Sequence, residues 1–185
     1  MKLIISISLF VFANLDLCAS FQNRIFSPLI KSVNLLSYNS KYNLPIISLN
    51  TNEKLNLSFD YLSEDAKDFA YTFVKCNSSW EKSENIFFHD FAEGMEEKFI
   101  TDFDFSENTT TNFIHYNLDF PSSESKFLMS GNYVLIVRET ETSKVLITQK
   151  FYVVENKTII TQQPKESKDY DLKATHHLIN FVVNH

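Results

Sequence analysis

Between residues 30 and 154 the chain is a succession of short segments with the pattern of β-strands, and this feature limits the fold most strongly. In some segments apolar and polar residues alternate, which places every second side chain on one face of a strand. Others are rich in β-branched and aromatic residues, which favour strands. The segments expected to form strands are 33–35, 55–59, 71–74, 113–118, 133–137 and 145–153.

Turn-forming residues, mainly Asn, Ser, Pro and Gly, separate these segments at positions 39–40, 50–53, 77–79, 121–123 and 130–132. About seven short strands joined by such turns, within roughly 130 residues, are typical of an immunoglobulin-like β-sandwich. The 18 Phe and 8 Tyr residues supply enough apolar material for a core. The sequence therefore predicts an all-β sandwich of this type.

Residues 81–106 form the longest stretch without a clear pattern, and they include His89, Asp90, Gly94 and several acidic residues. We expect a long loop there, with room for a short strand near 99–101. Long structured loops on a β-sandwich often bind partners.

The first 20 residues have the features of a signal peptide. Lys2 supplies the positive charge, and the apolar run at 3–12 is too short to cross a bilayer. Cleavage is expected after Cys18-Ala19-Ser20, so that the mature chain begins at Phe21. Cys18 also suggests a lipid-modified cysteine, but the residues before it are not the small ones that this modification requires.

The chain changes character near its C-terminal end. Residues 162–173 are polar and linker-like, whereas residues 178–184 return to a strand pattern without an evident partner strand. We therefore expect four parts in the chain. They are a signal peptide at 1–20, a sandwich at 21–161, a linker at 162–173 and the first strand of a truncated second domain at 174–185.

Several classes of function are disfavoured. The 17 Lys and Arg residues are scattered and the net charge is −6, so no nucleic-acid surface is expected. Only Gly94 and Gly131 are present, whereas nucleotide-binding loops need several glycines. No two histidines have the helical spacing of a zinc protease, so neither a metal nor a cofactor is expected. After residue 20 no apolar stretch is long enough to span a membrane.

Catalysis is not expected either. Cys76 is the only cysteine left after cleavage, so it cannot form an internal disulfide, and only Lys75 beside it could lower its thiol pKa. We interpret Cys76 as a buried structural thiol. Carboxylates are plentiful, but nothing selects the pair that glycoside hydrolysis needs.

Five phrases follow one another in a distinctive order. They are Pro45-Ile46-Ile47, Leu57-Ser58-Phe59-Asp60, Cys76-Asn77 with Trp80, Thr109-Thr110 with His115-Tyr116, and Ser130-Gly131-Asn132-Tyr133. This order resembles the N-terminal domain of the type IX secretion system plug protein family, and residues 174–185 resemble the opening of the family's second β domain. The family typically has an acidic residue where this chain has Ser79.

The resemblance implies an exported periplasmic protein that associates with the large outer-membrane translocon barrel. It implies a steric mechanism, in which a folded β domain closes the periplasmic opening of the pore, and it supplies no catalytic residues. Six residues are candidates for structural or interface roles: Cys76, Trp80, His115, Tyr116, Gly131 and Tyr133. The alternative is a secreted β-sandwich module that binds carbohydrate or peptide through Trp80 and the 81–106 segment.

Overall fold

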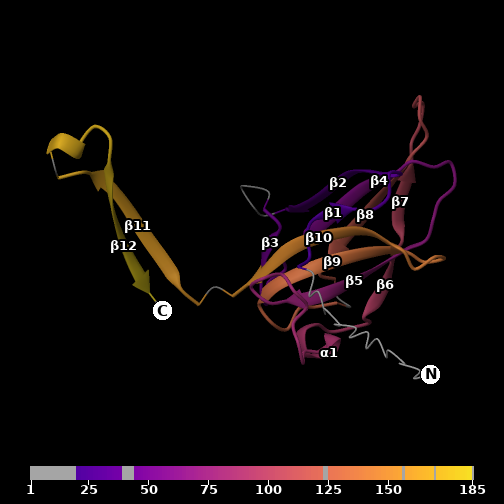
Figure 1. The fold of residues 1–185 in the computed structure, drawn as a ribbon, viewed down its shortest axis with the longest axis horizontal. Coiled ribbons are helices and arrows are strands. Elements are labelled where there is room, and N and C mark those ends of the chain that lie inside the picture. Colours follow the sequence, from indigo (N-terminus) through magenta and orange to yellow (C-terminus); the bar gives the residue numbers. More distant parts are fainter. Residues whose placement is uncertain (1–19, 39–43, 123–124, 156, 169, 185) are drawn as a thin grey trace, which may run out of the picture.

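The computed structural model describes residues 20–38, 44–122, 125–155, 157–168 and 170–184. The expected signal peptide and Cys18 lie outside these residues. Figure 1 shows two β-sheets packed face to face and, apart from them, a C-terminal hairpin. The all-β prediction is confirmed.

The first sheet has six strands. Their order is β1-β10-β9-β5-β6, and the short β3 pairs with β10 in parallel. All other neighbours in this sheet are antiparallel. The bounds are β1 Arg24–Ile25, β3 Ile46–Ser48, β5 Phe69–Cys76, β6 Glu97–Ile100, β9 Gly131–Glu139 and β10 Val145–Val154.

The second sheet has four antiparallel strands in the order β2-β4-β8-β7. Their bounds are β2 Ile30–Ser37, β4 Leu55–Tyr61, β7 Asp102–Phe105 and β8 Ile114–Phe120. Together the two strand orders are compatible with the immunoglobulin arrangement, in which the first, second, fifth and fourth strands form one sheet.

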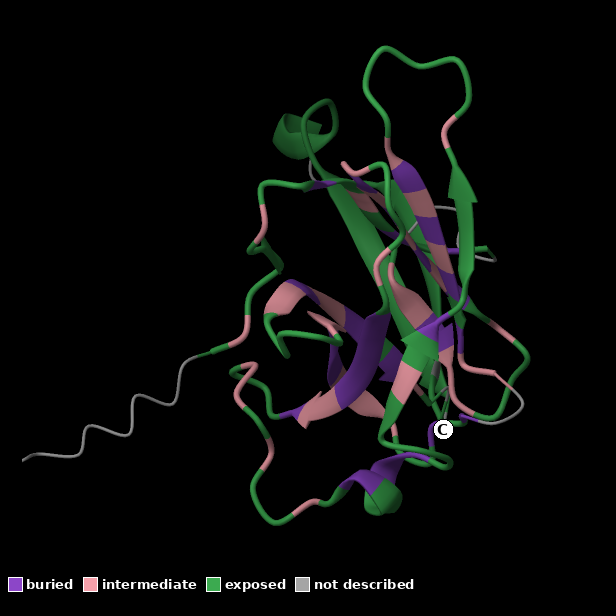
Figure 2. Cartoon of the chain, turned by 90° about the vertical axis from the view of Figure 1, so that its right-hand side faces the viewer, coloured by how far each residue is buried: buried purple, intermediate pink, exposed green. Residues whose placement is uncertain are grey.

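The core lies between the two sheets and is built mainly from aromatic rings. Along β4 buried and half-buried residues alternate, as the sequence pattern predicts. Figure 2 shows a similar banding along β8, the strand that follows the exposed β7. Near one end of the core the Phe59 ring stacks on Tyr116 at 5.2 Å between ring centroids. Towards the other end Phe73 packs against Phe120 and Phe151.

Residues 81–106 contain more structure than the predicted loop. The short helix α1 (Phe88–Phe91) buries Phe88 and Phe91 against the core. The chain then forms β6 at the edge of the first sheet and, after Thr101, crosses to form β7 at the edge of the second. The short strand expected near 99–101 is present as β6, but the loop prediction was wrong for α1 and β7. β7 lies at a sheet edge, and an edge strand does not need an uninterrupted apolar face.

The C-terminal segment also differs from the expectation. Residues 159–166 form β11 (Ile159–Glu166), followed by a short 3-10 helix (Tyr170–Leu172) and β12 (His177–Asn184). β11 and β12 pair along their whole length, from Ile159 opposite Asn184 to Glu166 opposite His177. The predicted strand at 178–184 is therefore present, but it has a partner, and that partner takes in the first half of the expected linker.

Candidate interaction surface

Tyr116 and Tyr133 are core residues with no exposed surface. The Tyr116 hydroxyl lies 2.9 Å from both the backbone N and the carbonyl O of Lys67, so it accepts from one and donates to the other. The Tyr133 hydroxyl donates to the carbonyl of Met129, four residues upstream, at 2.7 Å. This is the tyrosine corner found in immunoglobulin-like sandwiches. Burial raises the pKa of both hydroxyls.

Gly131 begins β9 beside the side chain of Lys75. The Lys75 Nζ donates to the carbonyl of Ser130 at 2.8 Å and lies 5.0 Å above the centre of the Tyr133 ring. A Cβ atom on Gly131 would lie 2.5 Å from this Nζ, and Gly131 has φ +144°. Gly131 suits this position because its φ lies in a region that residues with a side chain rarely adopt, and because a Cβ there would force the end of the Lys75 side chain to move. Burial lowers the pKa of the Lys75 ammonium.

Cys76 and Trp80 lie on the outer face of the first sheet, away from the main core. Cys76 is buried in a small cluster with Val134 and Ile136, against which Trp80 and Phe21 pack. Burial raises the pKa of the Cys76 thiol to about 11. At neutral pH this thiol is protonated, and it therefore lacks the character of a nucleophile.

The Trp80 ring is half-buried and already has neighbours. The Lys150 ammonium lies 4.5 Å above its centre, and Tyr152 packs edge-on at 5.3 Å. A ligand platform needs an open ring face, so these contacts speak against a carbohydrate site built on Trp80. Trp80 is a strand-end anchor that contributes to the outer cluster.

His115 lies on the outer face of the second sheet. Its Nδ1 is 2.6 Å from Oδ1 of Asp60 on the neighbouring strand. It contacts neither Cys76 nor Trp80, which belong to the other sheet. The six candidates thus fall into three separate places and do not form one site.

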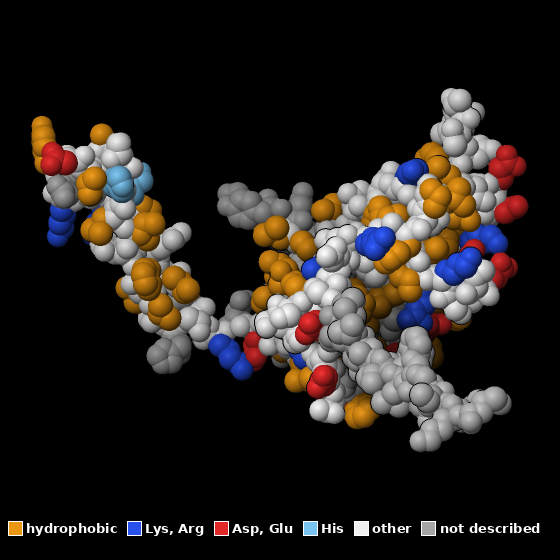
Figure 3. Space-filling model, viewed as in Figure 1, with side chains coloured by type: hydrophobic (Ala, Val, Ile, Leu, Met, Phe, Trp, Pro, Cys, Tyr) orange, Lys and Arg blue, Asp and Glu red, His pale blue; other side chains and the backbone are white. Residues whose placement is uncertain are grey.

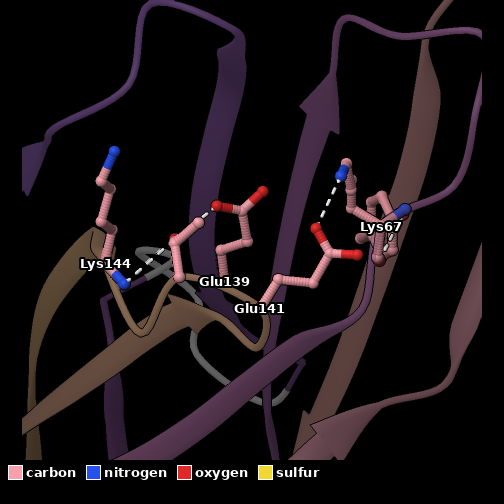
Figure 4. Close-up of polar contacts among 6 residues, drawn as sticks. Lys67, Glu139, Glu141 and Lys144 are labelled. Carbon is pink, nitrogen blue, oxygen red and sulfur yellow. Dashed lines mark hydrogen bonds and ion pairs between the residues drawn. The ribbon is translucent and has the colours of Figure 1, made fainter.

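One end of the sandwich is closed by polar contacts between two turns. Lys67, in the turn before β5, pairs with Glu141 in the β9–β10 turn at 3.0 Å, as Figure 4 shows. Within the latter turn the Thr142 hydroxyl donates to Glu139. Because Lys67 and Glu141 are both partly exposed, this arrangement orders the turns and adds little stability.

The β11–β12 hairpin carries an exposed apolar surface, and it includes the segment 178–184 whose strand pattern the sequence showed without a partner. One face carries Ile179, Phe181 and Val183 on β12, opposite Pro164, Gln162 and Ile160 on β11. Phe181 is 67% exposed and Ile179 is 58% exposed. Figure 3 shows hydrophobic side chains along this hairpin. A two-stranded hairpin with an open apolar face is marginally stable in water, so this face is suited to packing against another surface.

A hollow of about 680 Å³ lies at the β3–β4 turn. Its lining mixes apolar residues such as Phe127 with Glu53, Glu93, Lys54 and Lys126. Glu53 is already engaged, because its carboxylate accepts a hydrogen bond from the backbone N of Ser48 at 2.6 Å. The balanced charges favour no particular ligand.

Among the described residues no group of three or more His, Cys, Asp and Glu side chains is placed to hold a metal ion. None of the helices in that part of the chain is long and apolar enough to cross a bilayer.

Comparison with known proteins adds an independent observation. The crystal structure of a hypothetical protein from Parabacteroides merdae is 28% identical, with a TM-score of 0.77. The match covers 90% of this chain and 42% of that one, so this chain spans less than half the length of that relative. A second match is an alkylpurine DNA glycosylase from Pseudomonas fluorescens, bound to DNA with an abasic site analogue. It is 15% identical, with a TM-score of 0.33, and the match covers 68% of this chain and 30% of that one. This similarity is too low to support any inference. No curated protein matches.

The family comparison is more direct. Residues 30–155 match the family described as the first domain of the type 9 secretion system plug protein. This range begins at the first residue of β2 and ends just after β10, so it contains every strand of the two packed sheets except β1. The chain therefore belongs to the type 9 secretion system plug protein family.

Proposed function

We propose that this protein is a non-enzymatic subunit that binds the outer-membrane translocon of the type IX secretion system and closes its periplasmic opening. The observation that carries the proposal is the family match, which covers residues 30–155 and thus every strand of the two sheets except β1. We also propose that residues 1–20 direct the chain to the periplasm and are removed there.

A steric mechanism is consistent with the construction of the domain. A plug must keep its shape against the wall of a wide aqueous opening, and shape depends on a core that does not deform. Residues of both sheets, among them Leu57, Phe59, Leu135 and Phe151, are fully buried in one contiguous cluster. The turns at one end are tied together by Lys67 and Glu141.

The arrangement of the polar residues favours a role without covalent chemistry. The buried thiol of Cys76 has a pKa of about 11. His115 lies on the other sheet, where its side chain is hydrogen-bonded to Asp60. A nucleophile and its base must lie within hydrogen-bonding reach of one another, and these two do not.

We further propose that the β11–β12 hairpin belongs to a second β domain whose core covers Ile179 and Phe181. Two observations support this. The apolar face of the hairpin has no partner among the described residues. The match to the Parabacteroides protein covers 90% of this chain, which is more than residues 1–155 comprise, so it extends into the hairpin. It covers only 42% of that protein, whose remaining chain lies outside the match.

Binding and closure can be tested in a bacterium that carries this secretion system. An affinity-tagged full chain should co-purify with the translocon barrel, and deletion of its gene should let a large, normally excluded dye enter the periplasm. Re-expression should restore exclusion. Co-purification without any change in dye entry would overturn the gating role, and a failure to co-purify would overturn the binding role. Glycan binding by the isolated protein would instead support the carbohydrate-binding alternative.

A further inference from the structure

The edge strand β7 has no neighbour on one side. In the second sheet it pairs with β8, and no other described strand pairs with it. Its four side chains, Asp102 to Phe105, are all exposed. Figure 1 shows β7 at the margin of the sandwich, next to a long projecting loop. An edge of this kind presents backbone N–H and C=O groups that a further strand can use.

The hydrogen-bond ladder indicates which groups point outward. In an antiparallel pair, hydrogen-bonded residues alternate with residues whose polar groups face away from the partner strand. The backbone N of Ser106 donates to the carbonyl of Phe113 at 2.9 Å, immediately beyond the pairing of Phe105 with Ile114. Alternation from Ser106 therefore directs the N–H and C=O groups of Phe103 and Phe105 towards the open side.

The side chains of the same two residues are also available. Phe103 lies opposite Tyr116, and the centres of the two rings are 5.4 Å apart, so Phe103 lies on the core side of the sheet. Phe105, two positions further along the strand, lies on the same side. Yet Phe103 is 37% exposed and Phe105 is 56% exposed. They form an apolar margin that extends the core beyond the last strand.

The other face of β7 is acidic. Asp102 lies opposite Asn117, and Asp104 lies opposite His115, which in turn lies opposite Asp60 on β4. These carboxylates share the outer face of the sheet because they occupy alternate positions from the phenylalanines. A strand added beside β7 would thus meet aromatic rings on one face and carboxylates on the other.

We propose that β7 binds an extended segment of a partner protein by strand addition, and that this segment alternates basic residues with apolar ones. Its backbone pairs with Phe103 and Phe105. Its apolar side chains cover the two exposed rings, and its Lys or Arg residues lie against Asp102 and Asp104, since opposite charges stabilise cross-strand pairs. This activity goes beyond the proposed gating role and does not depend on it.

The test uses the full chain and a short fluorescein-labelled peptide in which lysine alternates with valine or phenylalanine. Fluorescence anisotropy should show saturable binding. The double variant Asp102→Lys, Asp104→Lys should weaken it roughly tenfold or more and should bind the peptide with glutamate in place of lysine. Phe99→Ala is the matched control, because Phe99 is an exposed phenylalanine on β6 in the other sheet. It should leave affinity unchanged.

A second measurement separates strand addition from simple charge attraction. Peptides N-methylated on the residues that face β7 should lose binding, whereas methylation of the alternate residues should preserve it. Bound peptide should slow hydrogen exchange at the amides of Phe103 and Phe105. The proposal is overturned if the lysine peptide does not bind, if charge reversal has no effect, or if both methylated peptides bind equally well. In those cases the carboxylates only protect the edge against association.

Discussion

The backbone N of Phe21 donates a 2.8 Å hydrogen bond to the carbonyl of Trp80. This bond joins the first residue after the predicted cleavage site to the turn that follows β5. The next residues continue along β10, where the Thr148 hydroxyl donates to the carbonyl of Gln22 and the backbone N of Lys150 donates to the Asn23 side chain. Residues 21–23 therefore lie over the outer cluster around Cys76 and are part of the fold.

Trp80→Ala should destabilise the domain by about 2 kcal/mol. This is less than the loss of a fully buried Trp, because the ring is only half-buried. Urea unfolding followed by circular dichroism would measure the change. Trp80→Phe, which keeps a ring between Lys150 and Tyr152, should lose less. An unaltered midpoint in Trp80→Ala would show that the outer cluster contributes nothing to stability.

Tyr116→Phe should cost more stability than Tyr133→Phe. The first change leaves both a backbone N–H and a C=O of Lys67 without their partner, whereas the second leaves only the carbonyl of Met129. We expect about 2 kcal/mol and about 1 kcal/mol respectively from thermal unfolding. The reverse order would mean that the tyrosine corner stabilises the sandwich more than the Tyr116 contacts do.

Gly131→Ala should destabilise the protein by roughly 1–3 kcal/mol, because the new Cβ meets the Lys75 ammonium and the backbone has a positive φ. Lys75→Ala is the matched variant, since it removes the ammonium but leaves the backbone as it is. In the double variant the effects should be less than additive, because the steric part of the Gly131→Ala cost disappears. Strict additivity in chemical denaturation would contradict the proposed clash.

Cys76 should make stability fall between about pH 9 and about pH 11. Burial raises the thiol pKa from 9.0 to about 11 in the folded state, so the unfolded state releases its proton first as the pH rises. The stabilisation is complete below pH 9 and is lost through this interval. In Cys76→Ala, the denaturation midpoint should therefore fall less between about pH 9 and about pH 11 than it does in the unchanged protein. Rapid alkylation of native Cys76 at neutral pH would contradict its burial.

Truncation after Glu155 should leave the melting temperature of the sandwich unchanged. β11 and β12 pair only with each other among the described strands, so no described strand of the sandwich loses a partner. Differential scanning fluorimetry of the full and truncated chains would measure this. The truncated form should also be the more soluble one, because Phe181 and Ile179 are removed. A marked fall in melting temperature would show that the hairpin completes the first domain.

Much of the sandwich could be predicted from local patterns. The alternation at 55–59 and the β-branched run at 145–153 correspond to β4 and β10, because both strands have one face in the core and must repeat every two residues. The edge strands β2 and β6 were predicted in part, at 33–35 and near 99–101, but the edge strand β7 was missed. Asp102-Phe103-Asp104-Phe105 has a period of two, but it is short and strongly charged, and it resembles a loop when its neighbour β8 is unknown.

The sequence by itself determined the strand class, the positions of the turns and the absence of nucleotide-binding glycine loops, because these depend on residues close together in the chain. Only the tertiary structure decided the roles of individual residues. Lys67 and Tyr116 are 49 positions apart, and His115 and Asp60 are 55 apart, yet each pair is in contact. Such partners depend on which strands lie side by side, and strand pairing is a property of the whole fold that no local pattern contains.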